Sequence, residues 1–159
     1  MLTILTATYN RAHTLSRLYA SLLAQTQCDF EWLIIDDGSN DNSKELINEF
    51  LMEGKIKISS QYQENMGKHA AINRGVSICR QDWIFIVDSD DVLEKKFVEN
   101  LLKLLHKYQA EVAVCQNSVF TKTRGVVHLH SQDCIKEKCY DFSDAIKSML
   151  YQKEFRSEE

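Results

Sequence analysis

Three aspartates lie close together near the middle of the chain, within Asp88–Asp91. They directly follow residues 83–87, a short and wholly apolar run that is typical of a buried strand. Carboxylates this close repel one another unless a cation or hydrogen-bond donors compensate their charge. Mg²⁺ and Mn²⁺ prefer oxygen ligands and bind through one or two carboxylates, with phosphates and water completing the shell. The segment is therefore a candidate site for a divalent metal ion.

Helix capping is an alternative explanation for part of this segment. Asp91 could be the N-cap of the following helix, with Glu94 three residues later as its capping-box partner. Ser39 or Asp41 could likewise cap a helix further upstream. Capping does not account for the two aspartates that precede Asp91.

Two further polar groups follow predicted strands, namely Thr8–Arg11 and Asp36–Ser39. In a parallel α/β sheet the ligand crevice lies outside the carboxyl ends of the strands. These two groups and Asp88–Asp91 would then meet at one edge of the sheet, which strengthens the case for a ligand site there.

The apolar pattern changes repeatedly between strand and helix periodicity, which is typical of βα units and a mostly parallel sheet. We predict strands at residues 2–8, 31–36, 55–62, 83–87, 111–120 and 126–129. We predict helices at residues 15–23, at 46–51 with Gly54 as a C-terminal stop, and at 68–79, 93–108 and 141–151. The fold class is therefore α/β.

Composition limits the classes of protein that remain. The 159 residues are 44% hydrophobic and 26% charged with a formal charge of −4, which predicts one globular domain over residues 1–159 rather than a disordered chain. No apolar run reaches the roughly 18 residues of a membrane span, and no Lys/Arg cluster indicates nucleic-acid binding. The first residues lack the basic and cleavage regions of a signal peptide, which predicts a cytoplasmic protein.

The order and spacing of four segments resemble the family 2 glycosyltransferases of the GT-A fold, which transfer sugars from nucleotide donors. These segments are Thr8–Arg11, Asp29–Ser39, Asn65–Gly75 and the Asp-x-Asp motif Asp88–Asp90. The resemblance implies a three-layer α/β/α fold with a mostly parallel central sheet. It also implies a nucleotide-sugar donor, expected to be a UDP-sugar, and Mg²⁺ or Mn²⁺ as cofactor.

The resemblance also implies roles for the matching residues. Asp37, together with Asp36, would hydrogen-bond the pyrimidine base, and Lys68 would lie near the base or the diphosphate. Asp88 would reach the ribose or the donor sugar. The metal ion that offsets charge on the diphosphate leaving group would be held by Asp90 with Asp91. The residues of the first strand end that would face the nucleotide are Thr8, Tyr9 and Arg11.

The chain departs from the family pattern in two respects. Ala7 stands where the family usually has proline, so the turn after the first strand lacks a fixed φ. Inverting members carry a catalytic Asp or Glu in the C-terminal half, which deprotonates the acceptor hydroxyl. No residue matches that position, and Glu154, Glu158 and Glu159 lie in a charged tail. The general base is therefore expected beyond Glu159, and a nucleotide-binding domain without turnover is an alternative.

A phosphatase of the haloacid dehalogenase type is another alternative, with Asp88 as nucleophile and Asp90 as acid/base. That motif normally stands near the start of its domain. A lysine and an acidic pair normally follow it well downstream, whereas here no acidic pair ends a later predicted strand.

Two non-enzymatic interpretations rest on single motifs. Asp36 and Asp37 resemble the acidic pair of phosphoacceptor receiver domains, although that pair normally follows the first strand. Two His and two Cys in the C-terminal part could form a tetrahedral zinc site, although their spacing matches no known finger. These residues are His128, His130, Cys134 and Cys139.

The family resemblance also implies the partners. We expect a nucleotide-sugar donor and a saccharide or lipid-linked saccharide acceptor with a free hydroxyl, and no nucleic acid. The implied context is the assembly of a bacterial surface polysaccharide at the inner face of the membrane, by peripheral association without a membrane span.

Overall fold

The computed structural model describes residues 1–81, 83–108, 118–121 and 125–128. The chain divides into two compact units, residues 1–102 and residues 103–159. The elements in chain order are β1 (Leu2–Thr8), α1 (Ala12–Leu23), β2 (Phe30–Asp36), α2 (Ser43–Glu53), β3 (Lys57–Tyr62), α3 (Lys68–Ile78), β4 (Trp83–Ile86), α4 (Phe97–Tyr108), β5 (Ser118–Thr121) and β6 (Gly125–His128).

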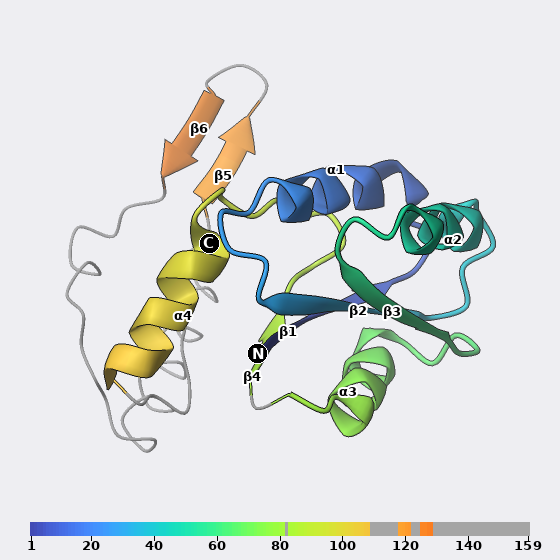
Figure 1. Ribbon diagram of the computed structural model, residues 1–159. Coiled ribbons are helices and arrows are strands. Elements are labelled where there is room, and N and C mark those ends of the chain that lie inside the picture. Colours follow the sequence, from blue (N-terminus) through green and yellow to red (C-terminus); the bar gives the residue numbers. More distant parts are fainter. Residues whose placement is uncertain (82, 109–117, 122–124, 129–159) are drawn as a thin grey trace, which may run out of the picture. The chain divides into compact units, whose positions relative to one another are not determined.

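The first unit is built on a parallel sheet with the strand order β3-β2-β1-β4. Helices α1 and α2 lie on one side of this sheet and α3 lies on the other (Figure 1). The predicted α/β fold with a parallel central sheet is therefore confirmed. After β3 the chain crosses to the opposite side of β1, so a topological switch point lies between β1 and β4. In open α/β sheets the ligand crevice forms at such a point, outside the carboxyl ends of the strands.

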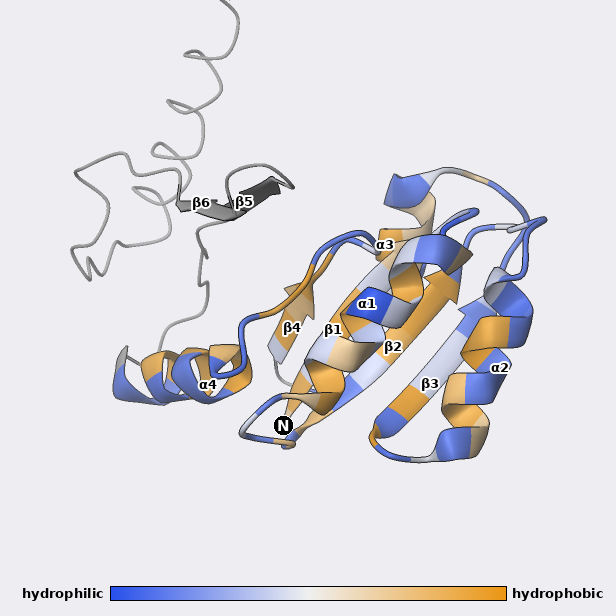
Figure 2. Cartoon of the chain, turned by 90° about the horizontal axis from the view of Figure 1, so that it is seen from above, coloured by the Kyte–Doolittle hydropathy of each residue, from blue (hydrophilic) through white to orange (hydrophobic). Residues whose placement is uncertain are grey.

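The face of the sheet toward α1 and α2 is packed with aromatic and aliphatic side chains. Tyr19, Trp32 and Phe50 stack on one another, with ring centroids 4.1–6.0 Å apart. Trp32 is fully buried, and its Nε1–H donates a hydrogen bond to Thr6 Oγ1 at 3.0 Å. The central strands β1 and β2 are buried along nearly their whole length, and Figure 2 shows apolar residues on both.

The opposite face packs against α3 through Leu5, Leu33, Ile35 and Ala71. Gly75 permits this close contact, because a Cβ atom added there would lie 2.3 Å from Leu5 Cδ1. The short distance between α3 and the sheet fixes where the first residues of α3 stand relative to the strand ends.

The predicted elements of the first unit are largely confirmed, and Gly54 ends α2 with a left-handed φ of 59°. Helix α4 differs, since it begins at Phe97 rather than at Leu93. The preceding residues bond to α1 instead: Leu93 N–H donates to Ser21 Oγ at 3.2 Å. The predicted capping box of Asp91 and Glu94 is therefore wrong, because no helix starts at Asp91.

Strand β4 also differs from the prediction of a wholly buried strand. Ile84 and Ile86 are 36% and 46% exposed. Within the part of the sheet that the structure describes, β4 pairs with β1 alone, so it is an edge strand. Ile84 and Ile86 are two residues apart, so both project from the same face of the sheet, the one on which Leu5, the register partner of Ile86, packs against α3.

The described part of the second unit contains an antiparallel pair in which Ser118 of β5 lies opposite His128 of β6. These strands overlap the strands predicted at 111–120 and 126–129. The helix predicted at 141–151 and the acidic tail lie outside the described residues, as do His130, Cys134 and Cys139 of the proposed zinc set. Among the described helices, none has the length and apolarity needed to cross a bilayer.

Candidate functional site

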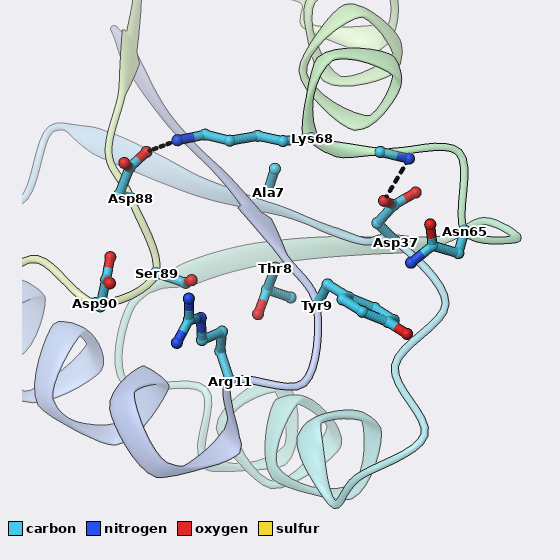
Figure 3. Close-up of a pocket in the computed structure, with 11 residues that line it drawn as sticks. Ala7, Thr8, Tyr9, Arg11, Asp37, Asn65, Lys68, Asp88, Ser89 and Asp90 are labelled. Carbon is cyan, nitrogen blue, oxygen red and sulfur yellow. Dashed lines mark hydrogen bonds and ion pairs between the residues drawn. The ribbon is translucent and has the colours of Figure 1, made fainter.

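A cleft of about 410 Å³ opens at the carboxyl ends of β1, β2 and β4 (Figure 3). It lies at the switch point of the sheet, and all three polar groups recognised in the sequence contribute to it. The lining residues are Ala7, Thr8, Tyr9, Arg11, Asp37, Asn65, Gly67, Lys68, Asp88, Ser89 and Asp90.

Two of the predicted site residues do not line the cleft. Asp36 is 4% exposed, and its Oδ1 accepts a hydrogen bond from Ser39 N–H at 2.9 Å, so it closes the turn after β2. Its Oδ2 has no hydrogen-bond partner among the described residues. Asp91 is exposed outside the cleft, and its N–H donates to the Asp88 carbonyl at 3.0 Å.

Four lining residues had no role assigned from the sequence, and two of them, Asn65 and Ser89, carry polar side chains; the other two are Ala7 and Gly67. Asn65 lies in the turn before α3, and Gly38 lets that turn come close, since a Cβ on Gly38 would lie 2.7 Å from Asn65 N. Ser89 is 7% exposed and stands between the two aspartates of the cleft. Asn65 belongs to a motif that the sequence does single out, but nothing in the sequence distinguishes Ser89 as buried.

Asp37 organises the wall of the cleft formed by the turn before α3. Its Oδ1 accepts hydrogen bonds from Gln63 Nε2 at 2.7 Å and from Met66 N–H at 2.9 Å, and its Oδ2 accepts one from Gly67 N–H at 2.8 Å. Asp37 is 3% exposed, so this buried carboxylate is compensated by three donors. An ionised carboxylate offers about four acceptor positions, which leaves one on Oδ2.

Lys68 and Asp88 form an ion pair between α3 and the segment after β4 (Figure 3), with Nζ and Oδ1 2.7 Å apart. Their side chains are 55% and 45% exposed, so the pair is well solvated. Pairs of this kind contribute only about 0–1 kcal/mol. Lys68 can therefore exchange Asp88 for a more strongly charged partner at little cost.

The aspartates after β4 suit a cation that a bound ligand helps to hold. Although Asp91 is exposed, neighbouring atoms displace part of the water around its carboxyl group and raise its pKa, and the nearby charges of Asp88 and Asp90 raise it further. No group of three or more metal-ligating side chains converges in the described part of the chain. Asp88 and Asp90 nevertheless both line the cleft, and two carboxylates suffice for Mg²⁺ or Mn²⁺ when phosphates and water supply the other ligands.

The loops after β1 and β2 are tied together beside the cleft. Asn10 has a left-handed φ of 52°; its N–H donates to Ser39 Oγ at 3.0 Å, and its Oδ1 accepts from Asn40 N–H at 2.8 Å. Asp41 accepts hydrogen bonds from the first residues of α1 and α2. Its Oδ2 accepts from Ala12 N–H at 3.1 Å and its Oδ1 from Ser43 N–H at 3.0 Å. The N-cap position of α2 itself is Asn42, so neither Ser39 nor Asp41 is the N-cap residue.

The stability contributed by Asp41 is expected to depend on pH. Burial acts to raise the pKa of Asp41, but hydrogen bonds from Ser43 and from Ala12 N–H outweigh it and hold the pKa below its usual 3.8. A lowered pKa in the folded state means that the stabilisation is present above 3.8 and is lost as the pH falls through the lowered value. The destabilisation of Asp41→Asn, measured by urea unfolding, should therefore be constant above about pH 5 and shrink as the pH falls below 3.8. The exposed Asp29→Asn is the control; an Asp41→Asn effect that is constant with pH would contradict this role.

The fold and cleft define a doubly wound α/β protein with a polar cleft at its switch point. Within that class the chain belongs to glycosyl transferase family 2, whose family model matches residues 3–156. This membership favours the glycosyltransferase interpretation over the phosphatase and receiver alternatives.

Two relatives illustrate the similarity. Glycosyltransferase GlyA of Streptococcus pneumoniae is 32% identical over 157 residues, which cover 98% of this chain and 22% of GlyA. Poly(ribitol-phosphate) β-N-acetylglucosaminyltransferase TarP of Staphylococcus aureus is 29% identical over 126 residues, covering 77% of this chain and 38% of TarP. The chain thus spans less than half the length of either relative.

Solved structures confirm the GT-A fold. TarS residues 1–349 of S. aureus, in complex with UDP, superpose with a TM-score of 0.70 at 21% identity, over 79% of this chain and 37% of that one. Mannosyltransferase PcManGT of Pyrobaculum calidifontis, in complex with GDP-Man and Mn²⁺, gives a TM-score of 0.61 at 20% identity, over 65% of this chain and 32% of that one.

Proposed function

We propose that this chain binds the nucleotide-sugar donor of a metal-assisted, inverting glycosyltransferase, and that the donor is a UDP-sugar. The observation that carries the proposal is the cleft at the switch point. It combines a buried carboxylate that has one acceptor position left, Asp37, with two aspartates, Asp88 and Asp90, and two cations, Arg11 and Lys68.

Asp37 suits recognition of a pyrimidine base. Three donors of the protein hold its carboxylate in place, and the remaining position on Oδ2 can accept one N–H. Uracil presents a single ring N–H between two carbonyl oxygens, so it matches one free acceptor position. Tyr9, which is 45% exposed in the cleft, offers an aromatic surface on the same side (Figure 3).

The other side of the cleft suits the diphosphate. Asp90 would hold the divalent cation, as expected from the sequence. Asp88, for which the resemblance implied a contact with the ribose or donor sugar, takes the place of Asp91 as second carboxylate ligand, because Asp88 lines the cleft and Asp91 does not. Lys68 and Arg11 would face the phosphate oxygens. A cation bound there supplies positive charge against the leaving diphosphate. Asp36 closes the turn and Asp91 lies outside the cleft, so we assign neither a direct contact with the donor.

The proposal leaves the general base outside the cleft, since all three carboxylates that line it have roles on the donor side. A second candidate is donor binding without turnover, since no carboxylate that lines the described cleft is left to act as general base. We further propose a saccharide or lipid-linked saccharide acceptor of the bacterial surface and a cytoplasmic site at the inner membrane face. The similarity to TarP, whose name specifies a ribitol-phosphate polymer, supports the surface polymer.

Calorimetric titration of UDP, GDP and dTDP into the chain, first with Mn²⁺ and then with EDTA, tests the proposal. We expect UDP to bind in the presence of Mn²⁺ and to bind more weakly in EDTA. Binding of GDP in preference to UDP would contradict base recognition by Asp37, and binding of none of the three would contradict the function.

Lys68 is expected to oppose binding of a free cation and to assist binding of a diphosphate. In Lys68→Met, Asp88 loses its partner, so Mn²⁺ alone should bind about twofold to fivefold more tightly. UDP should bind more weakly, because the cation that faces the diphosphate is gone. Mn²⁺ titration followed by electron paramagnetic resonance measures the first effect and calorimetry the second. Arg74→Met is the control, since Arg74 lies on α3 and contacts Gln61 away from the cleft; shifts of both affinities in the same direction would refute this dual role.

A further inference from the structure

One face of α1 and its C-terminal extension holds the segment that carries the cleft aspartates. Arg17 and Ser21 lie four residues apart on α1 and so project on the same side of the helix, and Gln25 follows just after the helix ends. Arg17 Nη2 donates to the Asp90 carbonyl at 3.1 Å, and Ser21 Oγ accepts from Leu93 N–H at 3.2 Å.

Gln25 uses both ends of its amide in this contact. Its Nε2 donates to the Glu94 carbonyl at 2.8 Å and to the Ser21 carbonyl at 3.0 Å, and its Oε1 accepts from Val98 N–H at 3.0 Å. Gln25 is 6% exposed, so these bonds are shielded from water. Arg17, Ser21 and Gln25 follow one another in the same order as their partners between residues 90 and 98, so the contact is continuous.

The segment needs such support because it has no regular structure of its own. Strand β4 ends at Ile86 and α4 begins at Phe97, and the residues between them are neither helix nor strand. Their backbone groups bond to α1, and Thr26 N–H adds a further bond to the Lys95 carbonyl at 3.0 Å. The place of Asp90 in the cleft is thus set from outside the cleft, by side chains that do not line it.

We propose that Arg17, Ser21 and Gln25 are positioning residues that hold Asp90 where it reaches the cation and the diphosphate. They act through the backbone of residues 90–98 and touch no ligand. The inference rests on the proposed function and adds to it the residues that determine how much the metal ion contributes to donor binding. If these residues had a purely structural role, their substitution would lower the unfolding free energy but would not change the ratio of UDP affinities measured with and without metal.

The test compares UDP affinity in Mn²⁺ with UDP affinity in EDTA for Gln25→Ala, Ser21→Ala and Arg17→Met, with urea unfolding of each variant. We expect the Mn²⁺-dependent gain in affinity to fall about tenfold in Gln25→Ala and about threefold in the other two, while affinity in EDTA stays unchanged. The core variant Leu33→Val, on the face opposite α1, should lose stability without changing the gain.

The Arg17→Met variant gives the sharpest outcome, because loss of its charge and loss of its positioning contact are expected to change Mn²⁺ affinity in opposite directions. Removing a cation near Asp90 would by itself strengthen binding of Mn²⁺, whereas a loss of position weakens it. Arg17→Lys, which keeps a donor, should restore part of the gain.

If the wild type shows the gain and the folded variants retain it in full, the positioning role is refuted while the proposed function stands. If the wild type binds UDP without any gain from Mn²⁺, the metal role fails and this inference fails with it. Should Gln25→Ala not fold, Arg17→Met decides, since its side chain is exposed.

Discussion

Asp37→Ala is expected to lose about 3 kcal/mol or more of unfolding free energy together with its selectivity for uridine nucleotides. The carboxylate satisfies three donors, Gln63 Nε2, Met66 N–H and Gly67 N–H. Gln63 is 6% exposed, so its amide would be left without a partner in a buried position. The turn that forms one wall of the cleft would lose its anchor, and a base would lose its acceptor.

Urea unfolding measures the loss of stability, and calorimetry with UDP and GDP measures selectivity. Asp37→Asn keeps one acceptor oxygen and replaces the other with an amide NH₂ group. This NH₂ group would have to face a donor N–H in place of either Oδ1 or Oδ2, so the hydrogen bonds on that side are lost while those on the other side remain. Asp29→Ala is the matched control, since it removes the same charge from an exposed position at the other end of β2. An Asp37→Ala variant as stable as this control and with unchanged preference for UDP would rule out both roles.

Asp90→Ala is expected to remove the Mn²⁺-dependent part of UDP binding, a loss of more than about tenfold in metal affinity, with little change in stability. Its side chain is exposed in the cleft, so folding does not depend on burying it. Surface substitutions of this kind usually change the unfolding free energy by less than about 0.5 kcal/mol.

The neighbouring variant Asp91→Ala provides the control for Asp90→Ala. It removes the same charge one residue further on, from a side chain that does not line the cleft. Titration of Mn²⁺ in the presence of UDP should therefore separate the two variants. Equal losses in both would mean that overall negative charge, rather than ligation by Asp90, attracts the cation; a loss in Asp91→Ala alone would reverse the assignment.

The elements that the sequence predicts best are those that are buried along their whole length. Strands β1 and β2 match their predicted ranges to within a residue, because nearly all of their side chains are buried between the two layers of helices. Gly54 marks the end of α2 because glycine adopts the left-handed conformation there at low cost. The start of α4 was misplaced because the backbone of residues 93–96 bonds to α1, which is distant in the sequence, instead of continuing a helix.

The amino-acid sequence by itself determined the α/β class, the family and the three polar strand ends that form the site, because these depend on local periodicity and on residue type. Only the tertiary structure distinguished Asp37, which faces the cleft, from Asp36, which closes the turn beside it. It likewise paired Lys68 with Asp88 and showed that Ile84 and Ile86 of β4 are exposed. Adjacent carboxylates look alike in a sequence, and what each one does depends on donors, strands and helices that the fold brings to it from far along the chain.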